Sequence, residues 1–461
     1  MLVLVDTKCG NINGINQKKL KVIHVLNHYL PERTAGTEVY VHALSVFLKN
    51  NGVSVKVVTP HRGYKDSVNF EFQGIEVHQF SETSILDREL IMGFREPDGL
   101  SPFMQFIESE KPDIVNFHEL AGSNGIGIGH VKLAKSVGSK VVMTFHLAGY
   151  SCKTGTLVQN HTHLCAGKID ELRCGSCYLK QKGLKSSSYL ISQISFNAKK
   201  LGFDFRKMNH PVGTLLGTAN VIGRVKNDLT DLVDACDQLV SLTDWYSRIL
   251  LLNKTPGSKI TVIKQGLPLK IIENDSMLEF ENQNSPLKLL FLGRISPFKG
   301  LHLLINAIKK MPQESVELSI YGDSEEGDYE IKLRYQTANM LNVHWKGKLE
   351  RTDVIYTMSR HHILCLCSTF SEMSPLVIQE AKAAKLPVLA SNVYGNAEQI
   401  EDGINGLLFD FNSVESLKFQ IQRLISQPEL LAVLKSNITD PRSFEEVGRE
   451  YLQLYQNVLE K

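Results

Sequence analysis

The stretch LKLLFLGRISPFKG, residues 287–300, decides the fold of this 461-residue chain. Its first six residues, Leu287–Leu292, are mostly apolar and predict a buried β-strand, after which Gly293 lets the backbone turn. Arg294 and Lys299 then follow before Gly300, so two cations project at the carboxyl edge of a sheet. Open α/β folds bind their ligands at this edge. The stretch therefore predicts a parallel-sheet domain with an anion-binding edge.

A second segment, EMSPLVIQE at residues 372–380, predicts the other half of this site. Glu372 and Glu380 flank a strand-to-helix turn, and the start of a helix offers unpaired backbone N–H groups and a positive partial charge. Cations suit a diphosphate, and a carboxylate suits vicinal hydroxyls, so the two segments together predict a nucleotide-sugar site. The turn that would approach the sugar or phosphate contains Met373, Ser374, Pro375 and Leu376.

Strands and helices alternate around both segments, which favours a doubly wound parallel sheet over residues 286–440. The predicted strands are Leu287–Leu292, Val316–Tyr321, Val343–Lys346, Ile363–Cys367, Pro387–Ser391 and Gly406–Phe409. The predicted helices are Leu301–Lys310, Asp328–Asn339, Arg351–Ser359 and Pro375–Ala384.

The same alternation occurs earlier and predicts a second Rossmann-like domain over residues 21–274. The predicted strands are Leu20–Asn27, Val53–Thr59, Ile114–Phe117 and Lys140–Phe145. Residues 62–110 and 150–230 fit neither a strand nor a helix pattern of this kind. Residues 1–20 are interpreted as an extension and 275–285 as a linker. A capping box at Ser443 predicts a terminal helix over 443–461 with one apolar face, which must dock on another surface.

Composition excludes several classes of protein. A formal net charge of +2 gives no global argument for nucleic acid as a partner. No apolar run reaches the ~18 residues of a spanning helix, and the apolar N-terminus is too short for a signal peptide. We therefore expect a cytoplasmic protein, with association at the cytoplasmic face of a membrane left open.

With these motifs in place, the chain resembles glycosyltransferase family 4. Gly293–Gly300 is similar to the Gly-Arg…Lys-Gly element of that family, and Glu372–Glu380 is similar to its Glu-x7-Glu element. The resemblance runs from about Lys21 to the end of the chain and is weak over 62–110 and 178–230. It implies an α/β fold of the GT-B type, with two Rossmann-like domains facing a central cleft and a C-terminal helix crossing back to the N-domain.

The resemblance also implies roles for single residues. Arg294 and Lys299 would hold the donor diphosphate, Glu372 would meet the transferred sugar, and Glu380 would bind the ribose. His146 would lie beside the donor sugar, and His118 would line the acceptor cleft. Donor contacts would also involve Gly36, Gly293, Gly322, Lys348 and the backbone of Met373, Ser374, Pro375 and Leu376.

The expected activity is retaining transfer of a sugar from a UDP- or GDP-sugar to a glycan or lipid-linked acceptor, in polysaccharide or glycoconjugate biosynthesis. Preorganised cations would stabilise the leaving diphosphate. The chain has no Asp-x-Asp sequence, so no catalytic metal is expected. Two alternatives stay open: a nucleotide-sugar epimerase of the same fold, and a catalytically silent subunit that only binds nucleotide sugars.

Four cysteines cluster within the stretch that fits neither pattern. Cys152, Cys165, Cys174 and Cys177 have the spacing C-x12-C-x8-C-x2-C. A Cys-x2-Cys knuckle with two further thiols favours a closed, structural zinc site in a reducing compartment. Two disulfides or free thiols are the alternatives.

Residues 178–210 are basic, with apolar residues interleaved. One interpretation is contact with an anionic membrane, where many acceptors are lipid-linked. The more ordinary interpretation is a helical hairpin that packs on the N-domain and keeps a solvated basic face.

Overall fold

A computed structural model describes residues 19–121, 123–160, 162–268, 285–324 and 327–461. Most of the expected extension 1–20 and linker 275–285 lies outside these residues. The chain divides into two compact units. The C-terminal unit consists mainly of Gln265–Ser443, and the N-terminal unit mainly of residues up to Lys264 together with Phe444–Lys461. Each unit is described by itself below.

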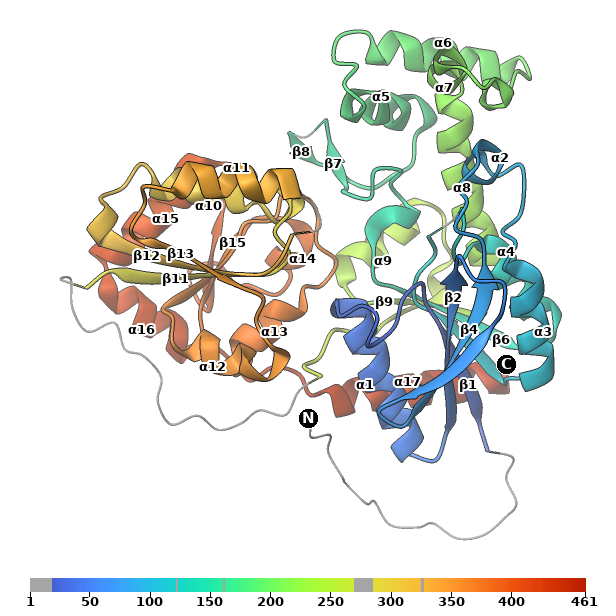
Figure 1. The fold of residues 1–461 in the computed structure, drawn as a ribbon, viewed down its shortest axis with the longest axis horizontal. Helices are drawn as coiled ribbons and strands as arrows, with labels where there is room; N and C mark the ends of the chain where they lie inside the picture. Colours follow the sequence, from blue (N-terminus) through green and yellow to red (C-terminus); the bar gives the residue numbers. More distant parts are fainter. Residues whose placement is uncertain (1–18, 122, 161, 269–284, 325–326) are drawn as a thin grey trace. The chain divides into compact units, whose positions relative to one another are not determined.

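The N-terminal unit is built on an eight-stranded sheet with the order β10-β9-β6-β5-β1-β2-β4-β3 (Figure 1). All neighbouring strands are parallel except the edge pair β3–β4. β5 is buried along its whole length, as expected for a parallel strand covered on both faces. The strands are β1 (Lys21–Val25), β2 (Ser54–Arg62), β3 (Val68–Phe72), β4 (Ile75–Glu82), β5 (Ile114–Phe117), β6 (Lys140–Phe145), β9 (Gln238–Ser241) and β10 (Ile260–Val262).

Helices cover both faces of this sheet, and a helical insertion follows β6 (Figure 1). The helices next to the sheet are α1 (Gly36–Asn50), α3 (Leu100–Glu110), α4 (Ile128–Ser136) and α9 (Asp244–Leu252). The short helix α2 (Arg88–Met92) lies against the insertion, where the Arg88 guanidinium donates to the Arg206 and Met208 carbonyls. The insertion contains the short strands β7 (Val158–Gln159) and β8 (His163–Leu164) and the helices α5 (Glu171–Gln181), α6 (Ser188–Lys200), α7 (Pro211–Leu216) and α8 (Thr218–Ala235).

The last helix, α17 (Phe444–Glu460), packs on the N-terminal unit. The Tyr40 hydroxyl donates to the Tyr451 hydroxyl at 3.1 Å, and Asn116 Nδ2 donates to the Tyr455 hydroxyl at 2.8 Å. Both tyrosines of α17 are buried, so its apolar face joins the core of this unit. Gly448 allows the close approach, because a Cβ there would lie 2.3 Å from the Phe47 ring.

The C-terminal unit has a six-stranded, fully parallel sheet with the order β13-β12-β11-β14-β15-β16. Its strands are β11 (Leu287–Leu292), β12 (Val316–Tyr321), β13 (Val343–Gly347), β14 (Ile363–Leu366), β15 (Val388–Ser391) and β16 (Gly406–Phe409). Its helices are α10 (Leu301–Ile308), α11 (Gly327–Thr337), α12 (Val354–Ser359), α13 (Leu376–Ala383), α14 (Tyr394–Ala397), α15 (Val414–Ser426) and α16 (Pro428–Ser436).

The two predicted Rossmann-like domains are confirmed. The prediction missed the β3–β4 hairpin, which lies within residues 62–110. Its signal in the sequence was the alternation of polar and apolar residues on either side of Gln73-Gly74. In the structure, both turn residues have positive φ, 47° and 82°. No helix among the described residues combines the length and apolar character that a membrane crossing requires.

Candidate functional site

Three glycines shape the carboxyl edge of the C-terminal sheet. Gly293 follows β11 with φ 151°, and a Cβ at Gly322, after β12, would lie 2.0 Å from the Gly293 carbonyl oxygen. Gly300 has φ 68°, and a Cβ there would lie 1.8 Å from the Cys367 carbonyl oxygen. Any larger residue at Gly322 or Gly300 would push the turn off the neighbouring strand ends. The glycines therefore hold the 294–299 turn tightly against this edge.

Lys299 and Glu372, predicted from separate segments, meet directly. Lys299 Nζ lies 2.6 Å from Glu372 Oε1, and Ser368 Oγ donates to the same oxygen at 2.7 Å. The Glu372 side chain is 9% exposed and that of Lys299 is 22% exposed. Lys299 also lies over the Phe370 ring, 5.5 Å from its centroid. A bound anion would compete for this ammonium group, and ligand hydroxyls could donate to the carboxylate.

The loop that carries Glu372 is supported from behind by buried polar residues. Ser391 Oγ donates to the Ser368 carbonyl at 2.8 Å, and Asn396 Nδ2 donates to the Ser391 carbonyl at 3.1 Å. A Cβ at Gly395 would lie 2.1 Å from the Glu372 carbonyl oxygen. The carboxylate therefore projects from a backbone with little room to move.

Glu380 points from α13 toward Arg351, a partner that sequence reasoning missed. Arg351 Nη2 lies 2.9 Å from Glu380 Oε1, and the Glu380 side chain is 6% exposed. Neither atom has an aligned hydrogen-bond partner among the described residues, so the contact is a charge pair rather than a directed bond. Glu380 thus keeps capacity to accept hydrogen bonds from ligand hydroxyls.

The remaining predicted donor contacts are distributed over both units. Arg294 is exposed at the end of β11, and Lys348 is exposed just after β13. Pro375 caps α13 with an extended backbone, so the helix begins at Leu376 rather than at the proline. Gly36 is the first residue of α1 in the N-terminal unit. The turn residues Met373, Ser374, Pro375 and Leu376 are buried or half-buried.

Three histidines form a buried row in the N-terminal unit, at or just beyond the ends of β1, β5 and β6. His24 Nδ1 lies 2.9 Å from His118 Nε2, and His118 Nδ1 lies 3.1 Å from His146 Nε2. Desolvation lowers the pKa of His24 and of His146 to about 3 and places the pKa of His118 well below its usual value. The row is therefore uncharged at neutral pH. The expectation that His118 lines a cleft is wrong, because its side chain is fully buried.

The tautomers of the three histidines follow from the unpaired ring nitrogen of His24 at one end of the row. His24 Nε2 is buried without a hydrogen-bond partner among the described residues. An orphaned N–H donor is rarer in proteins than an under-satisfied acceptor. His24 therefore carries its proton on Nδ1 and donates to His118, which in turn donates to His146 Nε2. His146 is left with an N–H on Nδ1, so it presents a hydrogen-bond donor.

Glu38, in the first turn of α1, is a further candidate that sequence reasoning missed. Its side chain is buried, and Oε2 has no hydrogen-bond partner among the described residues. Burial raises its pKa to about 7, although Arg33 lies 3.8 Å from Oε1. Its position two residues after Gly36 was the available signal.

The four clustered cysteines line one cavity of about 30 Å³ and form no disulfide. Backbone N–H groups point at three of the sulfurs: Asn160 at Cys177, Gly167 at Cys165 and Asp170 at Cys174. Across the residues that the structure describes, no group of three or more His, Cys, Asp or Glu side chains is placed to hold a metal ion. The zinc site thus stays a prediction.

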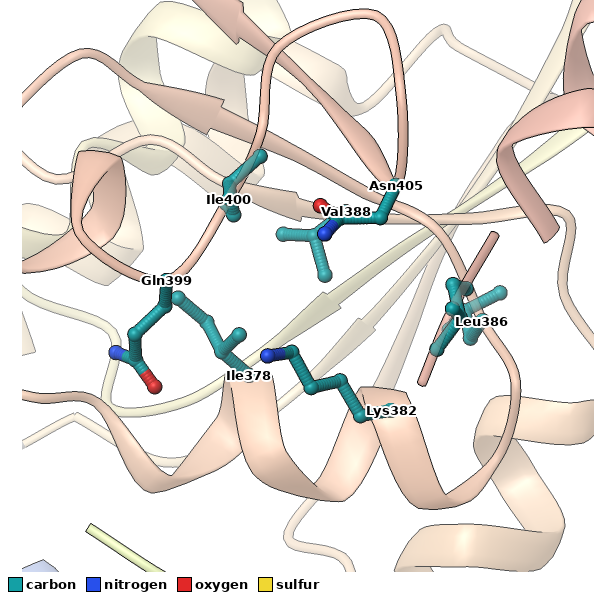
Figure 2. Close-up of a pocket in the computed structure, with 8 residues that line it drawn as sticks. Ile378, Lys382, Leu386, Val388, Gln399, Ile400 and Asn405 are labelled. Atoms are coloured by element: carbon teal, nitrogen blue, oxygen red, sulfur yellow. The ribbon is translucent and has the colours of Figure 1, made fainter. Parts of the chain in front are cut away.

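A small pocket in the C-terminal unit lies on the other side of α13 (Figure 2). Ile378 and Lys382 project into it from the helix, together with Val388 and Ile400. Glu380 lies roughly 200° around the helix from both Ile378 and Lys382. The cavity, of about 10 Å³, is therefore not part of the site built by Glu372 and Glu380.

The family model of glycosyl transferases group 1 matches residues 275–440. Spore coat protein SA of Bacillus subtilis is 28% identical over an alignment of 221 residues, and the match covers 43% of this chain and 58% of that protein. An uncharacterized glycosyltransferase of Methanocaldococcus jannaschii is 24% identical over 291 residues, covering 57% of this chain and 73% of that protein.

Solved structures extend the likeness to both units. The crystal structure of Anabaena HepE in complex with UDP and glucose covers 95% of this chain and 100% of its own, with a TM-score of 0.60 and 14% identity. This likeness confirms the predicted GT-B type of α/β fold, built from two Rossmann-like domains.

Proposed function

We propose that the chain is a retaining glycosyltransferase that moves a sugar from a UDP- or GDP-sugar to a hydroxyl of a glycan or lipid-linked acceptor, in polysaccharide or glycoconjugate biosynthesis. The observation that carries the proposal is the Lys299–Glu372 contact at the carboxyl edge of β11 and β14. This contact lies inside the segment that matches glycosyl transferases group 1. A cation and a carboxylate held together there suit the diphosphate and the sugar of one donor.

The charges that develop during sugar transfer indicate what each residue would do. Breaking the anomeric bond places positive charge on the sugar ring and negative charge on the diphosphate. Arg294 and Lys299 would stabilise the leaving diphosphate from a turn whose backbone is held by glycines on both sides. Glu372 would orient the sugar hydroxyls, Glu380 would bind the ribose, and His146 would donate a hydrogen bond.

The first experiment measures nucleotide release from UDP-, GDP- and ADP-sugars, with Lys299→Ala and the exposed Lys309→Ala as a matched pair. Selective release from one donor, lost in Lys299→Ala and kept in Lys309→Ala, supports the proposal and identifies the sugar. An epimerised product would favour the epimerase alternative. Silence with every donor, combined with tight UDP or GDP binding in titrations, would favour a binding subunit.

Zinc is a separate and simpler question. If the cysteine cluster holds a structural ion, metal analysis of the purified protein finds about one zinc per chain, and replacing Cys174 and Cys177 removes it. A metal-free, fully active preparation would refute this prediction.

A further inference from the structure

Helix α6 (Ser188–Lys200) differs from an ordinary amphipathic helix, because large apolar side chains face solvent and small polar ones face the protein. Leu190 and Ile194 are one helical turn apart, and Leu201 continues the same face just past the helix end. These three residues, with Tyr189 and with Phe203 in the following turn, are between 48% and 76% exposed. The apolar face of α6 therefore points into solvent.

The buried face of α6 is made of serines. Ser192 Oγ donates to the Leu172 carbonyl of α5 at 2.7 Å, and Ser195 Oγ accepts from the Ala219 backbone N–H of α8 at 2.8 Å. A Cβ at Gly175 of α5 would lie 2.4 Å from Ser192 Oγ, so the two helices approach closely. These bonds fix the rotation of α6, and turning its apolar side inward would break them.

The predicted hairpin does pack on its own unit, but the fully buried residues of α6 are serines, whereas Ile191 and Phe196 are only half-buried. Figure 1 draws α6 at the outer end of the insertion, beyond α5 and α7. An exposed stripe of large apolar side chains on a helix held in this orientation marks an interaction surface.

Charge indicates what covers this stripe. Residues 178–216 contain seven Lys or Arg and one acid, Asp204, which Arg206 already pairs at 2.7 Å. Lys185 precedes the apolar stripe, and Lys200 and Lys207 follow it, all exposed. Basic residues at both ends of an exposed apolar helix face suit an anionic bilayer, where the apolar side chains enter the interface and the lysines reach lipid headgroups.

We propose that α6 is a membrane-docking helix, which lies flat on an anionic lipid surface with Leu190, Ile194 and Leu201 inserted. The inference does not depend on the proposed catalytic activity, because it concerns a surface of the insertion and none of the donor-binding residues.

The test is sedimentation with phosphatidylcholine vesicles, with and without phosphatidylglycerol, using the full chain. We expect binding only to the anionic vesicles. Leu190→Ser with Ile194→Ser should weaken binding by about tenfold or more. The matched control is Leu251→Ser with Leu252→Ser, two leucines of α9 that are each 50% exposed, and it should leave binding unchanged.

A second pair of variants tests the charge. Lys200→Glu with Lys207→Glu should weaken binding, whereas reversal of the exposed Lys65 and Lys309 should change it less. Since all these side chains are on the surface, melting temperatures should match that of the wild type. Absent binding to anionic vesicles, or equal binding by the α6 variant and wild type, would overturn the proposal. So would a dimer that the α6 variant dissociates in the absence of vesicle binding, because a second copy would then cover the face.

Discussion

The two units carry polar residues at the carboxyl edge of similar parallel sheets, but one edge holds an ion pair and the other holds uncharged side chains. In the C-terminal unit, Lys299 and Glu372 form an ion pair that is accessible on its lysine side. In the N-terminal unit, His24, His118 and His146 are buried, uncharged and linked by hydrogen bonds. One edge is thus suited to neutralise a charged ligand, and the other to orient a polar one. The difference arises from residue type and pairing, since the desolvated histidines contact one another whereas Lys299 and Glu372 carry opposite charges in contact.

Acidification should break the comparison most strongly, because it protonates these histidines in the unfolded chain while the folded row stays neutral. The folded pKa of His24, about 3, lies below the unfolded value of 6.5. Between these values the unfolded chain binds more protons, so stability falls as pH decreases through 6.5. His24 and His146, which has the same folded pKa, should each cost about 2 kcal/mol of stability at pH 5.

The measurement is urea unfolding of the wild type and of His24→Gln between pH 7.5 and 5. The variant keeps a polar partner for His118 but removes one titrating group, so its loss of stability on acidification should be smaller. The exposed His163→Gln serves as the control and should follow the wild type. Equal pH dependence in all three proteins would show that His24 is not held neutral by burial.

Removing a cation from the charged edge should give the next largest effect. Lys299→Ala or Arg294→Ala should lower the rate of sugar transfer or nucleotide release by ~10²–10³, because a preorganised charge is lost where negative charge develops. The fold should persist, as both side chains lie at or near the surface. Near-wild-type turnover in both variants would contradict the site assignment.

The contrast between the edges also explains what could be read from the sequence. The turn at 293–300 and the element at 372–380 were predictable because each is a local pattern with a strand before it. The histidine row was not, since its members come from three strands and meet only when the sheet forms. The Arg351–Glu380 pair was missed for the same reason. For α6, the sequence showed interleaved apolar residues. Which face is buried depends on hydrogen bonds of its serines with α5 and α8, which form only in the folded chain.

Glu38 sharpens the comparison, since it is a buried acid in the same unit as the uncharged histidine row. Burial raises its folded pKa to about 7, above its unfolded value of 4.5. Its contribution to stability is therefore fully present below pH 4.5 and is lost as pH rises from 4.5 to about 7, by about 3 kcal/mol in total. Glu38→Gln should remove this loss, so the variant gains stability relative to wild type as pH rises from about 4.5 to about 7.5. Glu89→Gln, at an exposed first-turn acid of α2, should show no such gain, and a flat difference for Glu38→Gln would contradict the pKa shift.

The smallest expected effect concerns Arg351, the partner of Glu380 that the sequence analysis did not predict. Arg351→Met keeps an unbranched apolar stem but removes the guanidinium that faces Glu380, which is then buried without its counter-ion. Glu380 should then hold donor hydroxyls in a less defined position. We expect the KM for the donor to rise about tenfold with little change in kcat, as for the loss of an interaction shared by ground and transition states. Arg360→Met, at an exposed arginine just past α12, is the matched control. If the KM of Arg351→Met equals that of the control, Glu380 positions itself without Arg351, and the C-terminal edge functions through its lysine–glutamate contact alone.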